Sequence, residues 1–443
     1  MSGMSNAAPV VIVGAGLAGL ACAADLTAAG VDVQVLEAAD GVGGRMRTDR
    51  RAGFLLDRGF QVFNTSYPQV KRRLDLRALQ LRAFSPGMLL WTGAGRVRFT
   101  DPTRRPGQLS DLALGRIAGP RDLAALAMLS ARDMLLPARL LKGGPDLTTA
   151  AALTGAGISR ELTERFFRPF LSGVFLEDQL ETSSRFFHLV WRSMLRGSLC
   201  LPRRGMQAIP EQLAAALRPG TVRLETPVSD LTDDGVTLAD GTEVPARAVV
   251  VATDPGTAAG LLPGLVVPAT RTVTTIYHAA ATPPLAEPTL LVDTEREILH
   301  TCVLSEVTPG YSGDGRALVS TSVLGGAGGN GGAGGDGSAG GNGDAGGNGD
   351  AGGNGDAGQA RTEAAVRTRL AELYETDTAG WEHLSTYTIA GALPVMAAPH
   401  MLTLPTCVGP RRYACGDYRA TGSVQGALAS GARAARELLA TPA

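Results

Sequence analysis

The chain has 443 residues, of which 44% are hydrophobic, so it is long enough to form two or three domains around a large apolar core. Its formal net charge of -1 offers no basic surplus for a polyanion, and we therefore expect no nucleic-acid partner. The five cysteines are scattered and include no Cys-x-x-Cys pair, which argues for a reducing compartment and against a disulfide framework or a zinc site.

The first predicted element is a buried parallel strand at residues 10–13, and a G-x-G-x-x-G turn follows it directly. In such a turn the first glycine permits a tight bend, the second lets the backbone approach a pyrophosphate, and the third lets the following helix pack on the strand. A helix to about Gly30 and a second strand at residues 31–36 lead to an acid that can accept two ribose hydroxyls. The segment predicts dinucleotide binding by Gly14, Ala15, Gly16, Leu17, Ala18, Gly19 and Glu37.

A second glycine-rich segment, residues 41–48, follows this acid and contains Gly43, Gly44, Arg45 and Met46. Its flexible backbone and bidentate guanidinium suit a longer cofactor that is held from two sides. The Glu37 carboxylate would repel a 2′-phosphate, so NADP is not expected at this site.

Together with Glu37 and Ala38, this block resembles the flavin-containing amine oxidase and phytoene desaturase superfamily, in which it belongs to FAD. The resemblance implies that the backbone at Gly59, Phe60 and Gln61 passes beside the isoalloxazine ring. It also implies that Val228 meets the adenine through its backbone and that Ala252 ends a strand near the cofactor.

From about Tyr67 the pattern changes to helical periodicity with arginine-rich faces, which predicts a helical cap over residues 67–200. Four of the eleven phenylalanines fall in the run 166–176. Close aromatic spacing usually indicates core packing, and a channel for a long apolar substrate or a membrane contact are the alternatives.

The next predicted elements are a helix at 211–217, a strand at 222–228, hairpin turns at 233–235 and 239–241, and a buried strand at 248–253. A glycine-rich segment, residues 325–358, joins a strand at 317–321 to a helix that begins near Arg361. We interpret it as a disordered linker, because its six-residue repeat lacks the large apolar position of calcium-binding solenoids.

Near the end of the chain, a short strand at 412–415 precedes Gly416 and Asp417, and a helix is predicted at 423–435. Asp417 can accept hydroxyls of the ribityl chain. The helix N-terminus at Val424 and Gln425 can direct its dipole at the flavin. This segment is similar to the superfamily's C-terminal flavin motif.

The predicted fold class is α/β, a Rossmann-like FAD-binding domain with an inserted α+β substrate and cap domain. The FAD-binding domain takes residues 8–66, 201–260 and 385–443, the cap takes 67–200, and a substrate domain takes 261–384.

The family's amine oxidases carry a lysine near flavin N5 and an aromatic cage, but this chain has no lysine after Lys142 and has Ser423 where the cage tyrosine is expected. The C-terminal motif is similar to that of plant-type carotenoid desaturases. We therefore expect dehydrogenation of a small hydrophobic, isoprenoid-like substrate by hydride transfer to flavin N5. An amine oxidase, a protoporphyrinogen oxidase and a reduced-flavin carotenoid isomerase are the alternatives.

No catalytic residue is assigned from the sequence, and the five dispersed histidines are interpreted as structural or surface residues. Cys407 and Cys415 do not match a covalent attachment pattern, so FAD is expected to be non-covalent. Because no apolar run reaches membrane length and no basic residue precedes Val10, we expect a cytoplasmic protein without a signal peptide. Peripheral membrane contact remains an alternative, and the sequence leaves the oligomeric state open.

Overall fold

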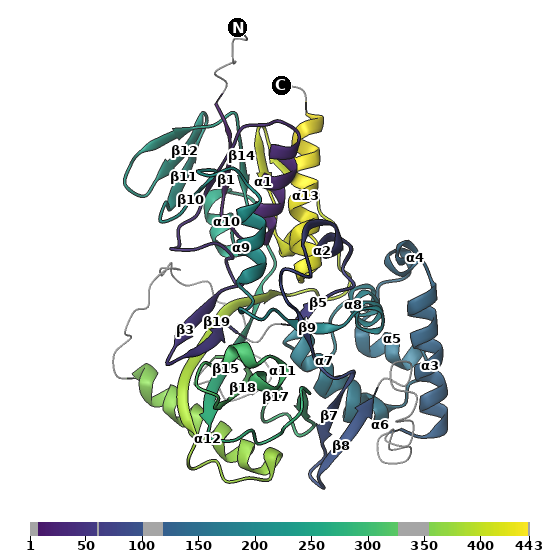
Figure 1. The fold of residues 1–443 in the computed structure, drawn as a ribbon. Helices are drawn as coiled ribbons and strands as arrows, with labels where there is room; N and C mark the ends of the chain where they lie inside the picture. The colour runs from purple at the N-terminus through teal and green to yellow at the C-terminus, as the bar shows by residue number, and fades with distance from the viewer. Residues whose placement is uncertain (1–7, 60–61, 101–117, 327–353, 442–443) are drawn as a thin grey trace.

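A computed structural model describes residues 8–59, 62–100, 118–326 and 354–441 (Figure 1). Its first layer is a six-stranded sheet in the order β10-β2-β1-β14-β21-β20. The pairs along the sheet are parallel up to β21, and only the edge strand β20 runs antiparallel. The strands are β1 (Val10–Val13), β2 (Val33–Leu36), β10 (Val222–Arg223), β14 (Ala248–Val251), β20 (Cys407–Gly409) and β21 (Arg412–Ala414). This doubly wound sheet confirms the predicted Rossmann-like fold.

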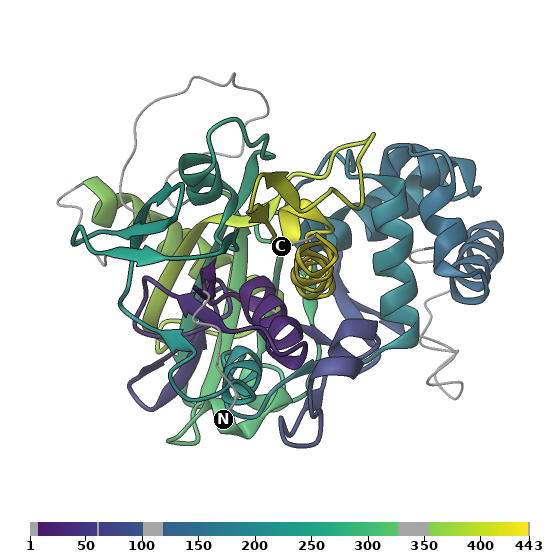
Figure 2. The ribbon, with the colours of Figure 1, turned by 90° about the horizontal axis from the view of Figure 1, so that it is seen from above.

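Two helices from opposite ends of the chain pack side by side against this sheet (Figures 1 and 2). They are α1 (Leu17–Ala28) and α13 (Val424–Ala440). A Cβ added to Gly431 of α13 would lie 2.0 Å from the carbonyl oxygen of Ala18 in α1, so only glycine permits this close approach. The contact brings the N-termini of both helices to one end of the sheet.

The remaining elements of the nucleotide-binding half are short. They are β3 (Thr48–Arg51), β4 (Phe54–Asp57), β5 (Phe63–Asn64), α2 (Pro68–Arg73), β6 (Arg82–Ala83), β9 (Leu199–Leu201), α9 (Ala208–Ala215), β11 (Val228–Thr232), β12 (Gly235–Leu238), β13 (Glu243–Pro245) and α10 (Pro255–Leu261). The antiparallel meander β11-β12-β13 confirms both predicted hairpin turns. The single strand predicted at 222–228 is instead divided between β10 and β11, with the intervening residues outside either strand.

A seven-stranded sheet in the order β19-β15-β18-β17-β16-β7-β8 forms the second layer. Its strands are β7 (Gly87–Trp91), β8 (Arg96–Thr100), β15 (Thr270–Ala280), β16 (Leu291–Asp293), β17 (His300–Val303), β18 (Ala317–Leu324) and β19 (Glu382–Pro394). The helices α11 (Leu304–Val307) and α12 (Asn354–Tyr374) accompany it, and α12 buries apolar side chains against the sheet. Because α12 begins at Asn354, the last five residues of the predicted linker belong to this helix. Residues 327–353 lie outside the described part of the chain.

The cap consists of α3 (Pro120–Leu135), α4 (Ala138–Gly143), α5 (Thr149–Gly155), α6 (Arg160–Leu162), a π-helical turn (Thr163–Phe167), α7 (Arg168–Phe175) and α8 (Ser184–Arg196). These helices occupy one side of the molecule, away from the six-stranded sheet (Figure 1). The sequence pattern predicted helices across 67–200 but missed β7 and β8, which lie in this range and pair with the second-layer sheet. No helix among the described residues is both long and apolar enough to cross a bilayer.

Candidate functional site

The first glycine turn behaves as its spacing predicts. Gly14 has φ +103°, a conformation that favours glycine. A Cβ on Gly19 would lie 2.0 Å from the carbonyl oxygen of Gly14, so the third glycine allows the helix to approach the turn. A Cβ on Gly16 would meet no atom within 4 Å, because this position opens into a cavity. The structure therefore leaves room for a ligand against the second glycine.

Glu37 lies at the end of β2 and lines the same cavity. Its carboxylate accepts the N–H of Ala15 at 2.6 Å and the N–H of Ala39 at 3.0 Å. These bonds fix the acid against the glycine turn. Its predicted contact with a ribose remains a prediction.

The second glycine segment folds directly onto the first. The N–H of Gly43 donates to the carbonyl of Ala15 at 2.9 Å. A Cβ on Gly44 would lie 3.6 Å from Cα of Gly16, and both Gly43 and Gly44 have positive φ. Two backbone segments without side chains thus face one space, which is the arrangement a pyrophosphate needs.

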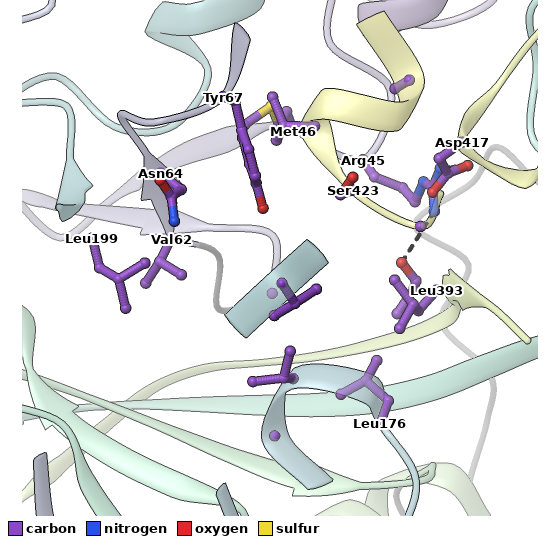
Figure 3. Close-up of a pocket in the computed structure, with 18 of the residues that line it drawn as sticks. Arg45, Met46, Val62, Asn64, Tyr67, Leu176, Leu199, Leu393, Asp417 and Ser423 are labelled. Atoms are coloured by element: carbon purple, nitrogen blue, oxygen red, sulfur yellow. Dashed lines mark hydrogen bonds and ion pairs between the residues drawn. The ribbon is translucent and has the colours of Figure 1, made fainter. Parts of the chain in front are cut away.

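Arg45 links the beginning and the end of the chain. Its guanidinium donates to the Asp417 carboxylate at 2.7 Å and to the carbonyls of Ala392 and Gly391 at 3.0 and 3.3 Å. The adjacent Asp417 charge raises the pKa of Arg45, so the guanidinium stays protonated. Figure 3 shows this pair on one wall of the cavity, with Tyr67 and Asn64 farther along it. The sequence assigned Arg45 to phosphate and Asp417 to ribityl hydroxyls; the structure adds the direct ion pair between them.

The start of α13 forms the next part of the wall. The Ser423 hydroxyl caps the helix by accepting the N–H of Gly426 at 3.1 Å, and Val424 lines the cavity. The Gln425 side chain instead accepts the N–H of Gln69 at 2.9 Å and so holds α2 against α13. Only the backbone of Gln425 is therefore left for the predicted helix-terminus contact.

One continuous cavity of about 1660 Å³ connects these segments. Most predicted cofactor residues line it: Gly14, Gly16, Leu17, Ala18, Glu37, Ala38, Gly43, Gly44, Arg45, Met46, Gly59, Val228, Ala252, Gly416, Asp417 and Val424. Ala15, Gly19 and Gln425 do not, and Phe60 and Gln61 lie outside the described residues. The volume exceeds the roughly 300–1,000 Å³ of an ordinary ligand pocket, so the cavity has room for a dinucleotide and a substrate together.

The cap contributes the other half of the cavity wall. Helices α3, α7 and α8 present apolar side chains there, and Figure 3 shows Leu176, directly after α7, on this side of the space. The phenylalanine run is buried, as the core interpretation predicts, and Phe166 and Phe170 of this run also form cavity wall. The alternative of a direct membrane contact by this run is wrong, because the four rings are at most 4% exposed.

Tyr67 and His300 are among the side chains of the cavity wall that were missed from the sequence. The half-buried Tyr67 lines its middle, where burial raises the pKa of its hydroxyl to about 12. His300 also lines it, and burial lowers the pKa of this imidazole to about 4, so it is neutral at pH 7. No local motif marks either residue. His300 reaches the site only because the second-layer sheet folds against it.

Beneath the wall, Asp57 is 3% exposed and accepts hydrogen bonds from the Thr48 hydroxyl at 2.5 Å, the Tyr311 hydroxyl at 2.7 Å and the N–H of Met206 at 2.9 Å. Burial raises the pKa of this carboxyl. Asp57 thereby connects the neighbouring strand β3 to the segments that contain Met206 and Tyr311. It lies just before Gly59, so it is a positioning residue. Among the described residues, no cluster of His, Cys, Asp or Glu could hold a metal ion.

Comparisons with known proteins agree with this geometry. A family model described as flavin containing amine oxidoreductase matches residues 17–331. An L-amino acid oxidase, Cdc18, of Crotalus durissus cumanensis is 44% identical over 80 residues, which cover 18% of this chain and 16% of that protein. A zeta-carotene-forming phytoene desaturase of Myxococcus xanthus is 28% identical over 288 residues, which cover 57% of this chain and 55% of the relative.

A coproporphyrinogen III oxidase of Propionibacterium freudenreichii subsp. freudenreichii is 27% identical and is matched over 62% of both chains. This chain therefore spans less than two thirds of the length of each of these relatives. Among solved structures, cyclohexylamine oxidase from Brevibacterium oxydans IH-35A has the same fold, with a TM-score of 0.66 and 17% identity over 98% of both chains.

Three observations lead to one conclusion: the two glycine segments that face one space, the cavity wall shared by the two ends of the chain, and the extent of the family match. The chain belongs to the flavin-containing amine oxidoreductase family, whose model matches residues 17–331.

Proposed function

We propose that this protein dehydrogenates a hydrophobic, isoprenoid-like polyene and that non-covalently bound FAD accepts the hydride equivalent. One observation carries the proposal. Among the described residues, the cap segment 83–199 contributes no charged side chain to the cavity wall. A wall without charge favours a substrate without charge, because an ionised group would lose its hydration there without gaining a partner.

The charged side chains of the cavity come from the nucleotide-binding half: Glu37, Arg45, Arg58, Asp254 and Asp417. A substrate bound as an ammonium ion would need a carboxylate near the reacting carbon, and the described part of the cap half offers none. Neither Lys71 nor Lys142 lines the cavity. His300 is neutral there at pH 7, since burial lowers its pKa to about 4. These features support the polyene over an amine.

Anaerobic titration of the purified holoprotein tests the proposal. Linear polyenes in detergent, primary amines, L-amino acids and a porphyrinogen are added separately, and loss of the yellow flavin absorbance is recorded. We expect bleaching by the polyene alone. Bleaching by an amine or a porphyrinogen would replace the proposal with that activity. Geometric isomerisation of a polyene by the pre-reduced protein, without bleaching of the oxidised form, would assign an isomerase.

Val174→Asp provides a matched variant for the same assay. Val174 lines the cap half from α7, so the substitution places a carboxylate in an apolar wall. We expect the KM for the polyene to rise at least about tenfold, because the buried charge has no partner. Reduction by dithionite should be unchanged. Val266→Asp, at a side chain that is 85% exposed, is the control and should behave as wild type.

A further inference from the structure

We propose that the outer surface of α3 and α4 docks on an anionic lipid bilayer and that the hydrophobic substrate enters the cavity there. The surface, called the α3–α4 face below, comprises Met128, Leu135 and Leu140 with Arg132, Arg139 and Lys142. Its role in substrate entry rests on the proposed function. Its affinity for a bilayer is a separate, directly measurable property.

The α3–α4 face is unusually apolar for an exposed surface. Met128, Leu135 and Leu140 are 71%, 79% and 54% exposed. Four of the nine large hydrophobic side chains exposed in the described part of the chain fall between residues 128 and 147. Single exposed apolar residues are ordinary, whereas a cluster of them marks a contact surface.

The charge of the α3–α4 face has one sign. Residues 120–143 contain two acids, and both are buried: Asp122 binds the backbone and hydroxyl of Ser159, and Asp133 lies 2.8 Å from His188. The exposed charges of α3 and α4 are therefore all basic, and among those of the face Arg132 is partly neutralised by the buried Asp133 at 3.6 Å. Met128, Arg132 and Leu135 recur at the spacing that places them on one helical face. A helix face that combines basic and apolar side chains is suited to the interface of an anionic membrane.

The cavity reaches the surface at this face. Leu123, Leu126 and Met134 line the cavity from α3, and Leu135 at the end of the helix both lines it and is 79% exposed. Helix α3 is thus the wall between the apolar cavity and the exposed face. Figures 1 and 2 show α3 and α4 at the outer edge of the cap, away from α1 and α13.

A bilayer fits this face better than a protein partner does. Protein interfaces take most of their binding energy from a few Trp, Tyr and Arg side chains in well-packed centres. The α3–α4 face has none of these aromatic residues and no exposed acid. Long basic side chains can reach lipid phosphates while the apolar ones enter the acyl boundary.

Vesicle flotation of the yellow holoprotein tests the docking. Vesicles of phosphatidylcholine alone are compared with vesicles that also contain phosphatidylglycerol. We expect flotation with the anionic vesicles and much less with the neutral ones. Arg139→Gln/Lys142→Gln should weaken the partition about 25-fold, at about fivefold for each basic residue. Met128→Asp/Leu140→Asp should abolish it. None of these four residues lines the cavity, so bound flavin should be retained.

The matched controls are Arg218→Gln/Arg247→Gln, which removes two exposed charges from the nucleotide-binding half, and Val266→Asp. Both should float like wild type. Holoprotein that stays in the supernatant, equal binding to neutral vesicles, or an equal loss in the controls would overturn the docking surface.

Anaerobic bleaching by a polyene separates this inference from the proposed function. With substrate in vesicles, Met128→Asp/Leu140→Asp should bleach more than tenfold more slowly than wild type, whereas in detergent the two should agree. Equal rates in vesicles would overturn entry at this face. Failure of wild type to bleach in either medium would refute the proposed function and leave the flotation result standing as a test of docking.

Discussion

Gly16 and Gly19, three residues apart in one motif, have different structural roles. A Cβ on Gly16 meets nothing within 4 Å, whereas a Cβ on Gly19 would overlap the carbonyl oxygen of Gly14 at 2.0 Å. Gly16 therefore leaves space for a ligand, whereas Gly19 leaves space for the backbone of the turn. These are the separate roles that the motif predicts for the two positions.

Gly16→Val should consequently give a folded protein that retains less flavin than wild type. The valine side chain would enter the cavity where the pyrophosphate is expected. The pyrophosphate would then lose charged hydrogen bonds to backbone N–H groups, which costs about 1.5–3 kcal/mol, or a ten- to hundredfold loss of FAD affinity. Gly19→Ala should instead lower the melting temperature of the apoprotein. Flavin absorbance and thermal unfolding of both apo variants check this, and a Gly16→Val protein that purifies fully yellow would contradict it.

The ion pair of Arg45 with Asp417 is the residue-scale link between the two ends of the chain. Asp417→Asn removes the charge but keeps the shape, and we expect a loss of about 1–2 kcal/mol in the free energy of unfolding and weaker FAD retention. A double-mutant cycle with Arg45→Gln, followed by chemical denaturation, measures the coupling. Strictly additive effects would show that the pair contributes nothing.

At the scale of elements, the contact of α1 with α13 decides the site. Helix N-termini carry unpaired N–H groups and partial positive charge. The glycine contact between these helices brings two such ends to one cavity, so both can favour the negative charge of a phosphate or a reduced flavin. Each helix could be predicted from its own residues, but their contact could not.

The contact of β15 with α12 introduces a dependence of stability on pH. His278 of β15 is buried 2.8 Å from Glu363 of α12, and burial lowers the pKa of the imidazole from 6.5 to about 4. The unfolded chain therefore binds this proton more tightly than the folded one. The neutral His278 imidazole therefore contributes fully to stability above pH 6.5, and this contribution is lost as the pH falls toward 4.

His278→Gln keeps a donor for Glu363 and removes this titration. We expect the slope of unfolding free energy against pH between 4 and 6.5 to fall by up to one proton, about 1.4 kcal/mol per pH unit. Denaturant unfolding at several pH values measures the slope. An unaltered slope would show that His278 does not titrate in this window.

At the scale of the whole molecule, the nucleotide-binding half is assembled from three separated stretches of chain, and the cap closes over it. The glycine-rich segment lies in the chain between β18 and α12. Since α12 begins at Asn354, the segment that can be shortened is 327–353 and not the whole predicted linker.

Replacing residues 327–353 by a glycine-serine linker of roughly ten residues should leave the flavin spectrum and the polyene titration unchanged, since the free energy of closing a loop changes little with its length. The visible spectrum and the melting temperature check this. Loss of flavin from the shortened chain would show that the segment supports the site.

The sequence by itself predicted the dinucleotide turn, the second glycine segment and the C-terminal helix, because each depends on spacing within a few tens of residues, and the resemblance of these segments to a known family implied FAD. Tertiary structure alone decided that Arg45 meets Asp417, that β7 and β8 join a sheet built largely from the second half of the chain, and that α3 separates an apolar cavity from an exposed basic face. These features depend on contacts between segments that are distant in sequence, and neither periodicity nor propensity records which faces will meet.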